Sequence, residues 1–316
     1  MIENKKRVWI FSFEYASVAK VGGLGEVPAN QAKHLSEQFN ITVFMPSHGK
    51  VEELKSKYTL EKLPFTCVGT INPTLFGIKE KEASYNISFY KFKKDNVEII
   101  LLSGDNSFTS KFLDDNTVYN PNTLMGKISL FSLGIRCLTR HFSENNKISL
   151  PDIVHLHDYH VVLAFFGMKQ VLARNGLKVA SILTIHLMTK PRFEYNFYRI
   201  CAIDESPIRV LLSNGYEMLN LNQILKISQF DDNKGTEFGM PLVEKIGAII
   251  SDIVTTVSES YLNSDIIPKC GKELIEFKAD FIYDGTDWDY YEIYEKVLKI
   301  HGHDLREYLN LMNYQK

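Results

Sequence analysis

The sequence predicts an α/β fold with a doubly wound, mostly parallel sheet. Two observations support this prediction. Short runs of apolar, β-branched and aromatic residues alternate with segments whose apolar residues recur at helical spacing. The short runs are also typical of strands buried on both faces, as in parallel sheets covered by helices. Hydrophobic residues make up 45% of the 316 residues, which is enough to build a core and argues against disorder.

The start of the chain predicts a βαβ unit. Residues 8–13 form an apolar strand pattern, and a glycine cluster follows at residues 22–25. Apolar residues then recur at roughly helical spacing from position 27 to 39, and residues 41–45 predict a second buried strand. Strand, glycine loop, helix and strand in this order predict a Rossmann-like sheet.

Most of the remaining chain continues the alternation of strands and helices. Residues 66–102 predict a small β-hairpin excursion, and the polar stretch 104–121 predicts a loop. Further strands are expected at 153–156, 179–185 and 253–257, and helices at 124–142, 161–172, between 207 and 225, and at 242–250. Ser258 is expected to cap a helix after the last strand.

The domain organisation follows from where the strands stop. We expect one Rossmann-like domain at residues 1–283, because no strand pattern comes after it. Residues 284–316 are expected to be a hinge and the helical start of a second domain, because so short a segment cannot form a domain alone.

Composition and charge exclude several classes of protein. The net charge is −2 and no basic stripe is present, so nucleic acid is not an expected partner. No signal peptide and no apolar run of membrane-spanning length is found, so no membrane partner is expected. The four cysteines are far apart in sequence, which favours reduced thiols in a cytoplasmic protein over disulfides or a cysteine zinc site.

The first candidate site is the glycine loop KVGGLGE at residues 20–26. Gly22 and Gly23 would let a ligand approach the backbone amides, and the following helix N-terminus favours anionic groups. Lys20 adds a positive charge, so the loop suits a phosphate or a set of sugar hydroxyls. The alternative is a plain strand–helix turn with an exposed lysine.

The second candidate site is HLHDYH at residues 155–160, where a predicted strand ends. His157, Asp158, Tyr159 and His160 would lie at the carboxyl end of a parallel strand, where such sheets bind ligands. A metal-dependent hydrolase is one alternative, but the spacing of these residues fits a metal site poorly. Histidines with a purely structural role are another. His186 ends the next predicted strand and is expected to face the same cleft.

The order of these segments resembles the starch and glycogen synthase family of glycosyltransferases. The resemblance covers nearly the whole chain, and its segments follow one another in the order that is typical of the family. They are KVGGLGE at 20–26, residues 41–46, PDIVHLHDYH at 151–160, LTIH at 183–186, KIGAIISDIVTTVSESY at 245–261 and residues 282–288.

The resemblance implies the N-terminal, acceptor-side half of a two-domain GT-B enzyme. Such an enzyme adds glucose from ADP-glucose or UDP-glucose to the non-reducing end of an α-1,4-glucan, with retention of configuration and without a cofactor or metal. By position, Lys20, Gly22 and Gly23 would line the diphosphate and glucose, and Asp158 and His160 would meet acceptor or donor sugar. His186 would contact the transferred glucose, and the implied catalytic residues are His186, Lys20 and Asp158. Substrate contacts are also implied for three residues that follow or precede Asp158 and for the acidic residue before the loop. They are His157, Tyr159, His160 and Glu14, the last at the cleft mouth.

Several positions depart from the family pattern. Tyr159 replaces a tryptophan, Leu187 and Leu242 each replace an asparagine, and Asp284 replaces the hinge asparagine. Most of the donor-binding groups belong to a C-terminal domain whose motifs the sequence lacks. We therefore expect the isolated chain to be inactive without that domain. A standalone glucan-binding module derived from a synthase is the alternative, and the sequence leaves ADP-glucose and UDP-glucose both open.

Overall fold

The centre of the computed structural model is a nine-stranded sheet, counted over the described residues, which are 5–145, 149–230, 240–283 and 295. Contacts group Met1–Ile282 into one compact unit. The predicted hinge and helical segment at 284–316 lie outside the described residues except for Glu295. The domain boundary therefore stays a prediction.

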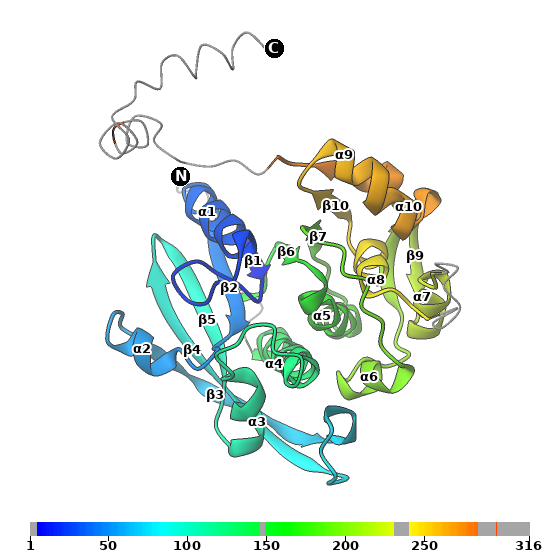
Figure 1. Cartoon of the computed structure of the whole chain (residues 1–316). Coiled ribbons are helices and arrows are strands. Elements are labelled where there is room, and N and C mark those ends of the chain that lie inside the picture. The colour runs from blue at the N-terminus through cyan, green and yellow to red at the C-terminus, as the bar shows by residue number, and fades with distance from the viewer. Residues whose placement is uncertain (1–4, 146–148, 231–239, 284–294, 296–316) are drawn as a thin grey trace. The chain divides into compact units, whose positions relative to one another are not determined.

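The sheet has the order β11-β10-β7-β6-β1-β2-β5-β4-β3 (Figure 1). Its strands are β1 (Arg7–Phe11), β2 (Asn40–Pro46), β3 (Glu61–Ile71), β4 (Ala83–Lys94), β5 (Val97–Gly104), β6 (Ile153–His157), β7 (Ala180–Ile185), β10 (Ile253–Thr256) and β11 (Ala279–Phe281). All neighbours from β11 to β5 pair in parallel, whereas β4 pairs antiparallel with both β5 and β3. The predicted α/β fold with a doubly wound, mostly parallel sheet is confirmed.

The strand order reverses beside β1. From β1 the chain builds outward through β2 and β5, and later returns to place β6 on the other side of β1. The loops after β1 and β6 therefore leave the sheet in opposite directions. Such a reversal point opens a crevice at the carboxyl ends of the strands, where α/β sheets bind ligands.

The helices connect these strands and pack around the sheet. They are α1 (Glu26–Leu35), α2 (Val51–Lys55), α3 (Ser107–Leu113), α4 (Leu124–Asn145), α5 (Val162–Arg174), α6 (Tyr195–Ile200), α7 (Leu221–Ile227), α8 (Val243–Ile250), α9 (Glu259–Tyr261), α10 (Ile267–Cys270) and α11 (Lys272–Ile275). The long helices α4 and α5 pack side by side (Figure 1). Within the described ranges, no helix combines the length and the apolar character that crossing a membrane requires.

Three sequence predictions about elements need correction. The stretch 104–121 is not all loop, because Asn106 caps α3 by accepting a hydrogen bond from the backbone N–H of Thr109. The region 207–225 is not all helix, because β8 (Ile208–Leu212) and β9 (Gly215–Leu219) form an antiparallel hairpin before α7. The predicted hairpin excursion is not separate from the sheet, because β3 and β4 extend its edge.

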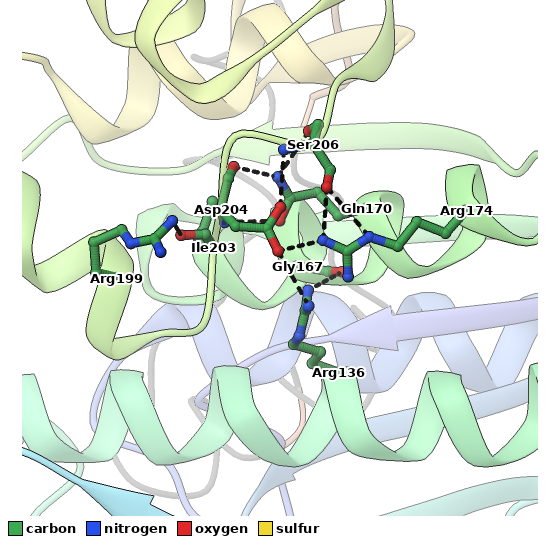
Figure 2. Close-up of polar contacts among 8 residues, drawn as sticks. All are labelled: Arg136, Gly167, Gln170, Arg174, Arg199, Ile203, Asp204 and Ser206. Atoms are coloured by element: carbon green, nitrogen blue, oxygen red, sulfur yellow. Dashed lines mark hydrogen bonds and ion pairs between the residues drawn. The ribbon is translucent and has the colours of Figure 1, made fainter.

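A polar cluster fastens the segment after α6 to α4 and α5 (Figure 2). The carboxylate of Asp204 lies between the guanidinium groups of Arg136 and Arg174. The fully buried Gln170 donates to the backbone carbonyls of Asp204 (2.6 Å) and Ser206 (2.9 Å), and accepts from the Asp204 N–H (3.2 Å). The cluster therefore fixes the segment 204–206 through hydrogen bonds to its backbone and ion pairs with the Asp204 side chain.

Candidate functional site

The residues that the sequence predicts for the site lie together at the carboxyl ends of three central strands. Glu14 and the glycine loop follow β1, Asp158 follows β6, and His186 follows β7. These three strands are parallel neighbours in the sheet. Their carboxyl ends therefore meet beside the point where the strand order reverses.

The carboxylate of Glu14 holds the glycine loop in place through backbone hydrogen bonds. One carboxylate oxygen accepts from the backbone N–H groups of Val21 (2.7 Å) and Gly22 (3.1 Å), and the other accepts from the hydroxyl of Tyr119 (2.6 Å). The residue is only 2% exposed, and its expected position at the cleft mouth stays a prediction. The carboxylate is buried because the loop and Tyr119 together satisfy it.

The glycine loop presents backbone rather than side chains. A Cβ atom built at Gly22 or Gly23 would meet no other atom within 4 Å, so the described residues leave this space open. Lys20 is half exposed and forms an ion pair with Glu26 at the start of α1. A mobile cation thus lies beside an open stretch of backbone at a helix N-terminus, which is a favourable setting for an anion.

Asp158 connects the ends of β6 and β7. Its carboxylate accepts from the backbone N–H of His186 (2.7 Å), and its own N–H donates to the carbonyl of Thr184 (3.0 Å). Burial raises the pKa of Asp158 to about 7, although the hydrogen bond from His186 acts in the opposite direction. Its backbone has φ of 60° and ψ of 179°, a region that non-glycine residues rarely adopt. Strained conformations of this kind concentrate at functional sites.

The histidines form a buried, neutral stack. The Nδ1 atom of His157 lies 3.0 Å from Nε2 of His186, and His155 Nε2 lies 2.7 Å from the hydroxyl of Thr184. Burial lowers the pKa of His155 to about 3 and that of His186 to about 4, and it lowers the pKa of His157 well below the usual value. At neutral pH each imidazole therefore carries one N–H donor and one acceptor nitrogen. The buried Nε2 of His157 has no hydrogen-bond partner among the described residues.

Tyr159 and His160 lie in an aromatic stack. The His160 ring is centred 3.8 Å from that of Tyr159, 4.8 Å from Tyr119 and 5.3 Å from Phe13. Burial, together with the smaller effect of the nearby Lys127, lowers the pKa of His160 to about 3. His160 thus packs as a neutral ring among these aromatic side chains. Its contact with a sugar stays a prediction.

Two buried charged residues that hold segments beside the site were not predicted from the sequence. The fully buried amine of Lys127, on α4, donates to the carbonyls of Asp115 (3.2 Å), Thr117 (2.9 Å) and Val118 (3.1 Å). This holds the segment that leads to Tyr119. A signal was present, because Lys127 occupies the apolar stripe of α4, where a lysine is unusual.

The second of these positions is Glu244 on α8, which is 1% exposed. One of its oxygens accepts from the backbone N–H groups of Thr189 and Lys190, both at 2.9 Å. It thereby fixes the loop that follows His186. No motif or residue spacing in the sequence identified Glu244 as part of the site.

Metal ligation finds no support at the site. Within the described ranges, no group of three or more histidine, cysteine, aspartate or glutamate side chains is arranged to hold a metal ion. His155, His157 and His186 instead bond to one another or to Thr184.

Comparison with known proteins identifies the family. Residues 7–277 match the family described as "Starch synthase catalytic domain". This chain belongs to that family. It is 26% identical to the glycogen synthase of Fervidobacterium nodosum over 98% of this chain and 53% of the relative. It is also 25% identical to the glycogen synthase of Chlamydia pneumoniae over 82% of this chain and 46% of the relative. The chain thus spans about half the length of the curated relatives that it matches.

A solved structure agrees with the family at the level of the fold. The catalytic domain of starch synthase IV from Arabidopsis thaliana, bound to ADP and acarbose, has a TM-score of 0.67 and 20% identity. The match covers 90% of this chain and 52% of that chain. The similarity places the sheet and its flanking helices in the fold of starch synthases.

Two of the residues that the sequence analysis identified as departures from the family pattern have different surroundings. Leu187, directly after His186, is 63% exposed, whereas Leu242 is completely buried ahead of α8. Leu187 therefore offers an apolar surface beside the site, and Leu242 serves the core. The departure at Asp284 lies outside the described residues.

Proposed function

We propose that this chain is the acceptor-side half of a glucosyltransferase that extends α-1,4-glucan from a nucleoside diphosphate glucose, with retention. Family membership over residues 7–277 supports the reaction class. The observation that carries the proposal is the arrangement at the strand ends, where neutral His186 and Asp158 lie beside an open glycine loop. In this proposal residues 1–283 form the acceptor-side domain and residues 284–316 lead into the donor-binding domain.

The glycine loop would bind the donor diphosphate. Its open backbone and the N-terminus of α1 favour negative charge, and Lys20 can leave Glu26 to pair with a phosphate. A cation placed where charge develops on a departing diphosphate stabilises the transition state. This gives Lys20 and the loop a direct part in the reaction.

His186 and Asp158 would position the transferred glucose. The neutral His186 ring can donate to or accept from a sugar hydroxyl, and its backbone carbonyl would lie near the anomeric centre. His157 orients the ring through the 3.0 Å contact, and Asp158 fixes the backbone of His186. Tyr159, His160 and Glu14 complete the proposed substrate-binding wall, with Glu14 acting through the loop that it holds.

The match covers only about half of the length of the curated relatives. We propose that a C-terminal domain completes the enzyme and that the protein works in the cytoplasm. The proposed donor is either ADP-glucose or UDP-glucose.

Glucose transfer tests the proposal. Radiolabelled ADP-glucose and UDP-glucose would be offered to glycogen, with this chain alone and with a separately supplied C-terminal half of a glycogen synthase. The proposal predicts transfer in the mixture and from one preferred donor. Glucan binding without transfer in either arm would contradict it and favour a glucan-binding module derived from a synthase.

A further inference from the structure

A cavity lies at the amino ends of the strands, away from the site at their carboxyl ends. This cavity of about 310 Å³ is bounded by α5, the segment 177–180, the β8–β9 hairpin and Asp252. Ala180 begins β7 and Asp252 directly precedes β10, so the cavity lies at the amino ends of these strands. Because β7 has six residues at about 3.3 Å each, roughly 20 Å separates the cavity from His186.

The charge of this cavity is unbalanced. Its lining includes three cations, Lys169, Lys178 and Arg209, and one carboxylate, Asp252. The carboxylate of Asp252 already accepts from the hydroxyls of Ser181 (2.6 Å) and Tyr216 (3.5 Å). The buried amine of Lys278 bonds to the carbonyls of Ile249 and Ser251 nearby, and burial lowers its pKa to about 7, so it adds only part of a positive charge at neutral pH. A net excess of positive charge therefore surrounds the space.

The three cationic groups of the lining differ in how they are held. The guanidinium carbon of Arg209 lies 3.4 Å from the ring centre of Tyr216, so the stacked ring fixes the plane of the guanidinium group. Lys169 donates to the carbonyl of Ile250 (2.6 Å) deeper in the wall, and burial lowers its pKa to about 8. Lys178 is exposed at the rim. A preorganised arginine and a mobile lysine thus face the same cavity.

The remaining wall is apolar. Leu172, Ala173, Leu177 and Val179 supply it from the end of α5 and the segment after it. A wall of this kind suits the carbon body of a ligand, while the cations suit its charged group. The volume lies at the lower end of the range for small-molecule sites.

We propose that this cavity binds a small organic phosphate, with the phosphate on Arg209 and Lys178 and the organic group against the apolar wall. A planar guanidinium group can donate two parallel hydrogen bonds to a phosphate. The excess of cations over carboxylates in the lining matches the charge of a phosphate monoester, which is between −1.5 and −2 at about neutral pH. This site is separate from the proposed donor site and does not depend on glucose transfer.

Calorimetric titration of the full chain with phenyl phosphate tests the proposal. We expect saturable binding of phenyl phosphate and none of benzyl alcohol, its uncharged analogue. Arg209→Gln should weaken binding by about tenfold or more, because a charge-assisted hydrogen bond is lost. Lys178→Ala, at an exposed position that tolerates truncation, should weaken it as well. Lys33→Ala, an exposed lysine on α1, serves as the matched control and should bind like the parent.

Lys20→Ala separates this cavity from the glycine loop. Binding that survives Lys20→Ala and is weakened by Arg209→Gln or Lys178→Ala would support the proposal. Binding that Lys20→Ala abolishes would place the phosphate at the loop and overturn it. Unchanged affinity in both Arg209→Gln and Lys178→Ala, or no binding at millimolar phenyl phosphate, would overturn it too. Circular dichroism of each variant confirms that the fold is retained.

Discussion

At the scale of single residues, the site depends on contacts between positions far apart in sequence. An acidic residue before the glycine loop could be singled out from the sequence, but its burial could not. Tyr119, whose hydroxyl donates a hydrogen bond to the Glu14 carboxylate, lies 105 residues away in the sequence. The bond between His157 and His186 likewise joins two strand ends that only the folded sheet brings together. Sequence order located these residues, whereas their hydrogen bonds required the structure.

Tyr119→Phe should loosen the glycine loop. The substitution removes one hydrogen bond to the Glu14 carboxylate and leaves the ring in place, so the free energy of unfolding should fall by about 1–2 kcal/mol. Urea denaturation measures this change. Tyr58→Phe is a suitable control, because Tyr58 packs against Phe92 on β4 and not against the glycine loop. Equal losses in the two variants would show that the Tyr119 hydroxyl has no special role.

The buried histidines predict a dependence of stability on pH. The pKa of His160 is about 3 in the folded chain and near 6.5 when unfolded, so the neutral ring contributes stability above pH 6.5 that is lost as the pH falls. Between pH 7 and 5 this loss is about 2 kcal/mol for His160 alone. His160→Phe keeps an aromatic ring in the stack and removes the titration.

The difference between parent and His160→Phe isolates this effect from other titrating groups. Burial raises the pKa of Asp158 to about 7, which works in the opposite direction in both proteins and therefore cancels. Denaturation at pH 7 and pH 5 should show a smaller loss for His160→Phe. Identical losses in the two proteins would mean that His160 is not neutral and buried as described.

At the scale of elements, long periodic segments were predictable and short ones were not. The strand β1 and the helix α4 follow clear patterns, because each buries one continuous set of apolar residues. The seven-residue helix α3 lies among aspartate, asparagine and serine residues that resemble a loop. The strand β9 exposes most of its residues and so lacks the alternation that identifies a half-buried strand.

Lys127→Met tests how α4 supports the site. The amine bonds three backbone carbonyls in the segment before Tyr119, and methionine would leave them buried without a donor. We expect the free energy of unfolding to fall by about 2–4 kcal/mol. Chemical denaturation provides the measurement, with Lys33→Met on the exposed face of α1 as the control. A stability equal to that of the control variant would contradict the role assigned to Lys127.

At the scale of the whole molecule, the alternation of strands and helices predicted a parallel sheet but not its strand order. The order decides function in this chain, because it places β6 directly beside β1 and brings the glycine loop next to Asp158. No local pattern encodes that neighbourhood, since the two strands are separated by β2, β5 and the antiparallel edge. The order of motifs along the chain located the site because it matched a family in which this neighbourhood already exists.

The central claim is that the strand-end residues of this chain act on a transferred glucose. Its most direct test compares glucose transfer to glycogen by the parent, His186→Ala and Lys33→Ala, each combined with the same C-terminal half of a glycogen synthase. The account predicts transfer by the parent and by Lys33→Ala, and a loss of about 10²–10³ in rate for His186→Ala. Transfer by His186→Ala at the rate of the parent would contradict the account.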